Sequence, residues 1–122
     1  MIIDSNILIY AVNPDYDRLL DFLAGRQLYV SLITKLEVLG YHRLKPVDKE
    51  ELEQLILATS ILPITNAVIA GAIRLRQQRK RSLGDSIIAA TASLYKLPIL
   101  TNNTADFDDI AGLEIIPMAS VL

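Results

Sequence analysis

The chain opens on a short apolar stretch that ends abruptly in a carboxylate. Residues 1–3 show no alternation of polar and apolar side chains, and Asp4 follows them directly. An uninterrupted apolar run favours a strand that is covered on both faces, as in the centre of a parallel sheet. Ser5 is expected to cap a helix that carries the apolar residues after it. Asp4 is therefore predicted at the carboxyl end of a central strand, the edge at which open α/β sheets bind ligands.

Strand-like and helix-like segments alternate along the rest of the chain. Four further apolar runs have the length of strands, at residues 28–31, 61–64, 98–101 and 114–116. Between them, Thr34, Asp48 and Thr65 are expected to start helices, and Pro46 to break the element that precedes it. The alternation predicts a single α/β domain over residues 1–122, with a mostly parallel central sheet of about five strands and helices on both faces.

Composition excludes several kinds of protein. With 52% hydrophobic and 21% charged residues, the chain is not disordered. It has no cysteine, which excludes disulfides and thiolate metal sites and fits a reducing cytoplasm. No apolar run approaches the ~20 residues of a membrane span, and the N-terminus lacks the basic segment of a signal peptide, so we expect a cytoplasmic protein without a membrane partner. The net charge of -2 implies that any nucleic-acid binding is local.

Four carboxylates occupy positions where a charge is otherwise unfavourable. Asp4 follows the first strand, and Glu37 lies in the helix after the second. Asp85 opens a helix, and Asp106 follows the fourth strand. Because the carboxyl ends of parallel strands share one edge of a sheet, all four are expected to converge there. Like charges at close range raise one another's pKa, and a bound cation would relieve that repulsion.

The donor atoms of this cluster favour a hard cation. Cysteine is absent, and the single histidine, His42, lies outside the four segments. Oxygen-only ligation predicts Mg²⁺ or Mn²⁺ and argues against zinc. An ion held by one or two carboxylates leaves room for a phosphate and lowers the pKa of a bound water. Phosphodiester hydrolysis is the reaction that fits such a site.

At the same positions the sequence resembles the PIN-domain nucleases, most closely the VapC-type toxins of type II toxin–antitoxin pairs. The matching segments, in the order of the family, are IDSN (3–6), SLITKLEVLG (31–40), LGDSIIAATA (83–92) and LTNNTADF (100–107). The resemblance implies a compact parallel sheet and a divalent-metal endoribonuclease that cleaves RNA. It also implies a cognate antitoxin whose tail fills the acidic pocket, and a homodimer formed through another helical face.

The resemblance further implies roles for particular residues. The catalytic acids would be Asp4, Glu37, Asp85 and Asp106. Of these, the metal ligands would be Asp4, Asp85 and Asp106. Neighbouring groups that hold water, ligand or substrate would be Ser5, Thr101 and Asn103.

Three features of the sequence depart from this pattern or leave it open. The family more often has threonine where this chain has Ser5, a change that keeps the hydroxyl. It often has a basic residue where this chain has Ala105, which removes a substrate contact there. Asp108 and Asp109 compete with Asp106 as the fourth acid, although Asp106 before an aromatic residue fits the pattern better.

Each of these residues also has an ordinary structural explanation. Asp4 alone could be a strand-end cap, Glu37 an acid that favours the helix dipole, and Asp85 a helix-start residue. The basic run at residues 74–81 would stabilise the end of any helix, and part of it, Arg81 especially, could instead line the approach of an RNA backbone. The apolar residues within 32–41 and 52–56 could be core, or could form a groove for an amphipathic partner helix.

Three other functions remain open at this point. The first is a PIN ribonuclease of RNA processing that has no antitoxin. The second is a non-catalytic Mg²⁺-binding signalling module of the receiver type, which requires adjacent acids after the first strand and a lysine after a late one. This chain has Ser5 after Asp4 and no such lysine. The third is a PIN fold that has lost activity and only binds RNA or protein.

Overall fold

A five-stranded parallel sheet forms the centre of the molecule, in the order β3-β2-β1-β4-β5. The computed structural model describes all of residues 1–122. The strands are β1 (Ile2–Ile3), β2 (Tyr29–Ser31), β3 (Ser60–Leu62), β4 (Ile99–Thr101) and β5 (Ile115–Pro117). Every neighbouring pair is parallel. The predicted α/β class and the strand number are confirmed.

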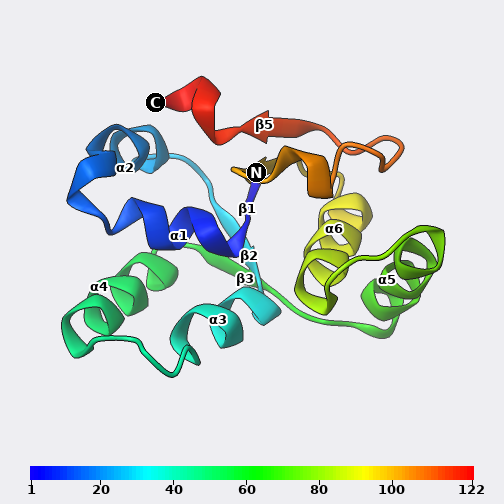
Figure 1. The fold of residues 1–122 in the computed structure, drawn as a ribbon, viewed down its shortest axis with the longest axis horizontal. Helices are drawn as coiled ribbons and strands as arrows, with labels where there is room; N and C mark the ends of the chain where they lie inside the picture. The colour runs from blue at the N-terminus through cyan, green and yellow to red at the C-terminus, as the bar shows by residue number, and fades with distance from the viewer.

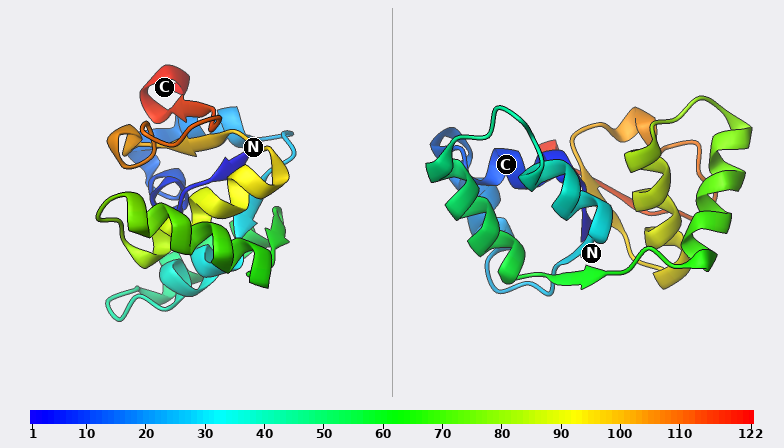
Figure 2. Two further views of the ribbon diagram at one scale, coloured as in Figure 1. Left: turned by 90° about the vertical axis from the view of Figure 1, so that its right-hand side faces the viewer. Right: turned by 90° about the horizontal axis from the view of Figure 1, so that it is seen from below.

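Helices cover both faces of this sheet. The α-helices are α1 (Ser5–Ala11), α2 (Asp17–Leu23), α3 (Leu32–Leu39), α4 (Pro46–Leu57), α5 (Asn66–Gln78) and α6 (Leu83–Tyr95). Short 3-10 helices are η1 (Pro14–Tyr16), η2 (Thr104–Asp106) and η3 (Met118–Val121). Helices α1 to α4 lie on one side of β1, and α5 and α6 pack together on the other (Figure 1). The view from below shows the same two groups on either side of the strands (Figure 2). None of the helices has the length and apolar character needed to cross a membrane.

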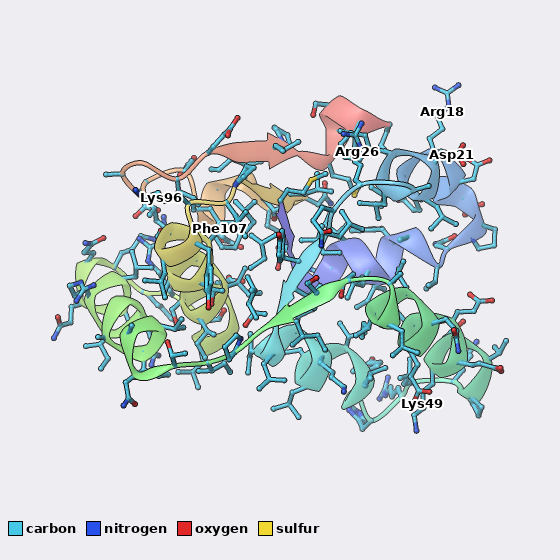
Figure 3. All side chains as sticks on the ribbon, turned by 180° about the vertical axis from the view of Figure 1, so that it is seen from behind. Arg18, Asp21, Arg26, Lys49, Lys96 and Phe107 are labelled. Carbon is cyan, nitrogen blue, oxygen red and sulfur yellow. The ribbon has the colours of Figure 1, made fainter.

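The first strand is buried on both of its faces, as its apolar sequence predicts. Ile2 and Ile3 are both 0% exposed. Ile2 belongs to the core that contains residues of α5 and α6, whereas Ile3 belongs to the core beneath α1, α2 and α4. Phe107 fills the α6 side of the interior, and Arg18 and Lys49 point outward from α2 and α4 (Figure 3). The strand is therefore short but central.

The chain adds strands to the sheet in two opposite directions, and the change of direction lies between β1 and β4. From β1 the chain adds β2 and then β3 toward one edge, and it then crosses to the other side of β1 to form β4 and β5. In sheets of this kind a crevice opens at the carboxyl ends of the two strands where the direction changes. Asp4 and Thr101 stand at the ends of these two strands.

Two helix starts differ from their predictions by a few residues. Asp4, and not Ser5, caps α1, because its side chain accepts the Ser5 backbone N–H. Helix α3 begins at Leu32 and not at Thr34, because the Ser31 hydroxyl at the end of β2 accepts the Ile33 backbone N–H. In both places a side-chain oxygen that directly follows the strand satisfies a free backbone donor, so the helix starts without an intervening loop.

The prediction for Pro46 was also wrong. Pro46 does not break an element but is the first residue of α4, a position whose backbone N–H has no helical partner in any case. Asp48 lies in the first turn of that helix and is not its cap. By contrast, Thr65 caps α5 as predicted, with its hydroxyl accepting the Val68 backbone N–H at 3.2 Å.

Candidate active site

Asp4 is a buried acid held by two hydrogen bonds at the point where β1 meets α1. It is 3% exposed. One carboxylate oxygen, Oδ1, accepts the Ser5 backbone N–H at 2.8 Å, and Oδ2 accepts the Thr101 hydroxyl at 2.8 Å. The second bond crosses from the end of β1 to the end of β4. Each oxygen therefore has a fixed direction and still has a lone pair free for a further partner.

The surroundings of Asp4 oppose its ionisation. Burial is the main cause that raises its pKa from 3.8 to about 6, and the negative charges of Asp85 and Glu37 contribute to the same rise. The hydrogen bonds from Thr101 and Ser5 act in the opposite direction and only partly offset these effects. The charges of acids from α3 and α6 are thus felt at the end of β1, as the sequence predicts.

Thr101 links Asp4 to the loop after β4. It is 0% exposed, and its Oγ1 accepts the Asn103 backbone N–H at 3.0 Å while its proton is donated to Asp4. The Asn103 side chain is exposed and makes no hydrogen bond within the protein. In this structure Asn103 therefore supports the site through its backbone, and its amide side chain is free.

Asp85 lies in the first turn of α6. The Ser82 hydroxyl caps this helix by accepting the Asp85 backbone N–H at 3.1 Å. Burial raises the pKa of Asp85, as does the negative charge of Asp106, whereas Ser82 and the positive charge of Arg81 lower it. Asp106, in η2, is thereby placed beside Asp85.

Glu37 reaches the cluster from the middle of α3. The Ser5 hydroxyl donates to Glu37 Oε1 at 2.8 Å and lies 3.0 Å from the Thr34 hydroxyl oxygen. The Glu37 carboxylate lies directly against the Cα of Gly84, in the first turn of α6. Sequence reasoning did not single out Thr34 or Gly84. The only available signals were a threonine one helical turn before Glu37 and a glycine next to a predicted ligand.

The three aspartates that follow β4 have different surroundings. Asp109 is engaged by two arginines: Arg79 Nη1 donates to its Oδ1 at 3.1 Å, and Arg81 holds both of its oxygens. These partners keep the pKa of Asp109 below its usual range, with the Arg81 hydrogen bond as the main cause. Asp108 is exposed. Asp106 is the one whose charge acts on Asp85, so it is the aspartate that the fold brings to the cluster.

Arg81 occupies a different place from the one expected for a substrate contact. Its side chain is 2% exposed, and its guanidinium donates to the carbonyl oxygens of Leu75 and Asp106 as well as to Asp109. This arginine ties α5 to η2 and does not line an open approach. The exposed cations of the basic run that form no ion pair are Arg74, Arg76 and Lys80.

The donor set of the cluster suits a hard cation that keeps part of its water shell. All the converging groups are carboxylates and hydroxyls, and the charges that shift the pKa of Asp4 are both negative. No three acidic or histidine side chains meet closely enough to form a complete metal site by themselves. Mg²⁺ commonly uses only one or two carboxylates and fills its octahedron with water and phosphate oxygens. The residues present fit an ion of that kind.

The apolar residues within 32–41 and 52–56, which the sequence leaves open as core or groove, are divided between core and surface. Leu52 and Ile56 are buried, whereas Leu36 and Tyr41 are 68% and 53% exposed. A hollow between α1, α3 and α4 is lined by Ile9, Val12, Val38, Tyr41, Leu44 and Leu52, with polar residues at its rim. It continues along α4 past Val47 and Leu55 toward Leu20 of α2. We call this surface the α4 groove.

Comparison with known proteins places these features in a family. The family model "PIN domain" matches residues 1–113. A toxin–antitoxin complex from Klebsiella pneumoniae contains a chain that is 30% identical, with 96% of each chain covered and a TM-score of 0.78. FitAcB from Neisseria gonorrhoeae is 26% identical, with 97% of each chain covered and a TM-score of 0.79. VapBC2 from Rickettsia felis, bound to a DNA fragment from its promoter, is 20% identical over 95% of this chain and 96% of that one, with a TM-score of 0.81.

No curated protein matched the sequence. The family model nevertheless spans most of the chain, and the solved relatives share its fold. PIN domains are of the nuclease type, and the Klebsiella pneumoniae relative is part of a toxin–antitoxin complex. The chain belongs to the PIN-domain family.

Proposed function

We propose that this protein is a divalent-metal-dependent endoribonuclease and the toxin of a type II toxin–antitoxin pair. The observation that carries the proposal is Asp4: a buried carboxylate at the switch point of a PIN fold, with its pKa raised to about 6 by burial and by two further acids. The repulsion between these acids destabilises the metal-free protein, and a bound divalent cation would relieve it.

The proposed division of roles follows from how each acid is held. Asp4, Asp85 and Asp106 would hold the ion, because they lie at the end of β1, in α6 and in η2, and because burial and neighbouring acids raise the pKa values of Asp4 and Asp85. A bound Mg²⁺ or Mn²⁺ would polarise the phosphate and lower the pKa of a coordinated water. Glu37 Oε1 is occupied by Ser5, whereas Oε2 makes no hydrogen bond and could accept a proton from an attacking water.

The α4 groove supports the assignment of a protein partner. Its floor is apolar, and its rim carries Arg43, Lys45, Glu50 and Glu51. An amphipathic helix would place its apolar face on such a floor and pair its charges with the rim. The relative from Klebsiella pneumoniae is part of a toxin–antitoxin complex, so the proposed occupant is an antitoxin segment. Ile69 and Ile73, which are 40% and 52% exposed on α5, would serve a homodimer on a separate face.

The test of the chemistry uses two conservative substitutions. Asp4→Asn and Asp85→Asn should each lower Mg²⁺-dependent cleavage of single-stranded RNA at least about 100-fold, and should abolish growth inhibition, because each replaces a charged ligand by a neutral one. Exposed Asp21→Asn on α2 is the matched control and should cleave as the wild type does. Cleavage is followed on labelled RNA and on DNA of the same sequence, with EDTA as the metal-free reference.

Two outcomes would contradict the proposal. Full cleavage by either variant, or equal cleavage in EDTA, would remove the metal mechanism. Cleavage of RNA that the product of the neighbouring reading frame does not inhibit would indicate an RNA-processing nuclease in place of a toxin. A receiver-type signalling module is excluded by the family to which the chain belongs.

A further inference from the structure

Glu37 is the acid of the cluster that needs the most help to hold its position. Asp4 is buried and Asp85 partly buried, whereas Glu37 is an exposed residue on α3 with a longer, more flexible side chain. A carboxylate on three rotatable bonds loses side-chain entropy when it is fixed. Its orientation must therefore come from contacts with neighbouring elements, and two such contacts are present.

The first contact is a chain of two hydroxyls that ends on Glu37. Ser5 has one hydroxyl proton, and an ionised carboxylate can only accept, so the Ser5 proton is directed at Glu37 Oε1 at 2.8 Å. The Thr34 hydroxyl oxygen, 3.0 Å from Ser5 Oγ, can then donate to Ser5 and complete the chain. Thr34 is 0% exposed and its hydroxyl makes no other hydrogen bond. Because this buried hydroxyl has no other partner, its hydrogen bond fixes the orientation of the Ser5 side chain.

The second contact is a space that only glycine leaves open. A Cβ atom on Gly84 would overlap Oε2 of Glu37 and lie 2.9 Å from its Cδ, closer than Cβ atoms come to other atoms in proteins; its 3.0 Å distance to Oε1 would also be tight. Gly84 is a buried residue in the first turn of α6, and it is not among the residues with a positive φ. Its backbone would therefore accept alanine, and the reason for glycine is the room that the Glu37 carboxylate occupies.

We propose that Thr34 and Gly84 are positioning residues for Glu37: Thr34 fixes the Ser5 hydroxyl that holds Oε1, and Gly84 leaves the gap through which the carboxylate reaches the first turn of α6. Neither residue touches substrate or metal in this scheme. Their effect on catalysis rests on the proposed function, whereas their effect on the Glu37 side chain does not.

The hydroxyl chain is tested by Thr34→Val, which keeps the shape of the side chain and removes its hydroxyl. In metal-free protein, the Glu37 side-chain carboxyl signal in ¹³C NMR should shift or broaden as the carboxylate loses its fixed orientation. With metal bound, kcat should fall about tenfold with KM unchanged, the size typical of supporting groups around a metal site. Thr34→Ser restores the hydroxyl and should return both readouts to within about twofold of wild type.

A matched control separates this effect from loss of a buried hydroxyl in general. Thr91 is also 0% exposed, and its hydroxyl bonds only to the Ile87 carbonyl within α6. Thr91→Val should leave the Glu37 signal and kcat unchanged. If Thr34→Val leaves the Glu37 signal as in the wild type, the hydroxyl chain does not position Glu37 and that half of the proposal is wrong.

The gap is tested by a double-mutant cycle. Gly84→Ala should shift the Glu37 signal and lower kcat about tenfold, while the melting temperature is maintained or rises, because alanine favours a helix more than glycine does. In a Glu37→Ala background the same Gly84→Ala change should have no further effect on kcat, because no carboxylate is left to displace. Gly71→Ala on α5, where a Cβ would meet Ala90 and not Glu37, is the control and should not move the Glu37 signal.

The outcomes distinguish the two proposals. Additive losses in the cycle, or an unmoved Glu37 signal in Gly84→Ala, would overturn the positioning role of Gly84. Shifted Glu37 signals in a protein whose wild type neither binds Mn²⁺ nor cleaves RNA would retain the positioning contacts and reject the proposed function.

Discussion

Asp4 performs two tasks with one side chain. As the cap of α1 it satisfies a backbone donor, and as a buried acid it contributes charge to the crevice. The structure therefore confirms the interpretation of Asp4 as a cap at the strand end, and its role as a metal ligand stays a proposal. Capping favours folding, whereas the buried charge opposes it, and the balance depends on pH.

The raised pKa of Asp4 sets the direction of that dependence. Folding raises it from 3.8 to about 6, so the folded state binds the proton more tightly than the unfolded chain does. The stability that protonation provides is fully present below about pH 4 and is lost as pH rises through about 6. Burial also raises the pKa of Asp85, which adds to the same trend. We expect the metal-free protein to be less stable at pH 8 than at pH 5.

Asp4→Asn should remove the Asp4 part of this dependence. In EDTA at pH 8 the free energy of unfolding of the variant should be about 2–3 kcal/mol higher than that of the wild type. The reason is that the rise in the pKa of Asp4 from 3.8 to about 6 corresponds to about 3 kcal/mol. At pH 4 the two proteins should be nearly equal. Urea denaturation at both pH values measures the difference. A variant that is less stable than wild type at pH 8 would contradict the assigned cause.

At the scale of elements, the two arginines before α6 hold the segment that carries Asp106. Arg81 bonds the Leu75 carbonyl of α5, the Asp106 carbonyl of η2 and the Asp109 carboxylate. Arg79 adds a bond to the Ala105 carbonyl at 3.3 Å. The basic run thus contains two kinds of residue: Arg79 and Arg81 connect elements, whereas the exposed Arg74, Arg76 and Lys80 form no ion pair.

Arg81→Ala should destabilise the fold by about 2–3 kcal/mol, because it leaves buried carbonyl acceptors without a donor and removes a paired charge. Arg74→Ala is the control, since this exposed arginine forms no ion pair, and it should change stability by less than about 0.5 kcal/mol. Urea denaturation gives both values. Equal, small effects would show that the Arg81 contacts do not hold η2 in place.

At the scale of the whole molecule, the sheet separates two helical layers with different exposed surfaces. The α4 groove lies on the side of α1 to α4, and the exposed isoleucines of α5 lie on the opposite layer (Figure 1). Asp4 and Thr101, at the carboxyl ends of β1 and β4, lie between these two layers. A partner can thus occupy the groove without repacking either core.

Val47→Asp should weaken the proposed antitoxin and leave RNA cleavage intact. Val47 is 62% exposed in the α4 groove, so a charge there disturbs the bound apolar face without unfolding the protein. Co-expression with the product of the adjacent reading frame should no longer restore growth. Leu94→Asp, at a 49% exposed position on α6, is the matched control and should remain neutralised. If the co-expressed protein neutralises Val47→Asp as well as it neutralises the control, the partner does not bind in the α4 groove.

Local chemistry allowed the sequence to predict most of the fold. The apolar run before Asp4 predicted a doubly covered central strand, and Thr65 and its following periodicity predicted α5, because both patterns depend on neighbours in the chain. The helix starts predicted at Asp48 and Thr34 were each misplaced by two residues, and Pro46 was taken as a break, since proline suits either the end of one element or the start of another. The four acids were selected with the help of the family resemblance, and the fold brought their charges into mutual range.

What the sequence alone determined was therefore the parallel α/β class, the central first strand and the carboxylates at the strand ends. The tertiary structure decided which of three aspartates after β4 joins the cluster, that Arg81 is enclosed by carbonyls and Asp109, and that Thr34 and Gly84 enclose Glu37. The physical reason is that hydrogen bonds and close packing between residues tens of positions apart depend on three-dimensional proximity, which periodicity and capping do not encode.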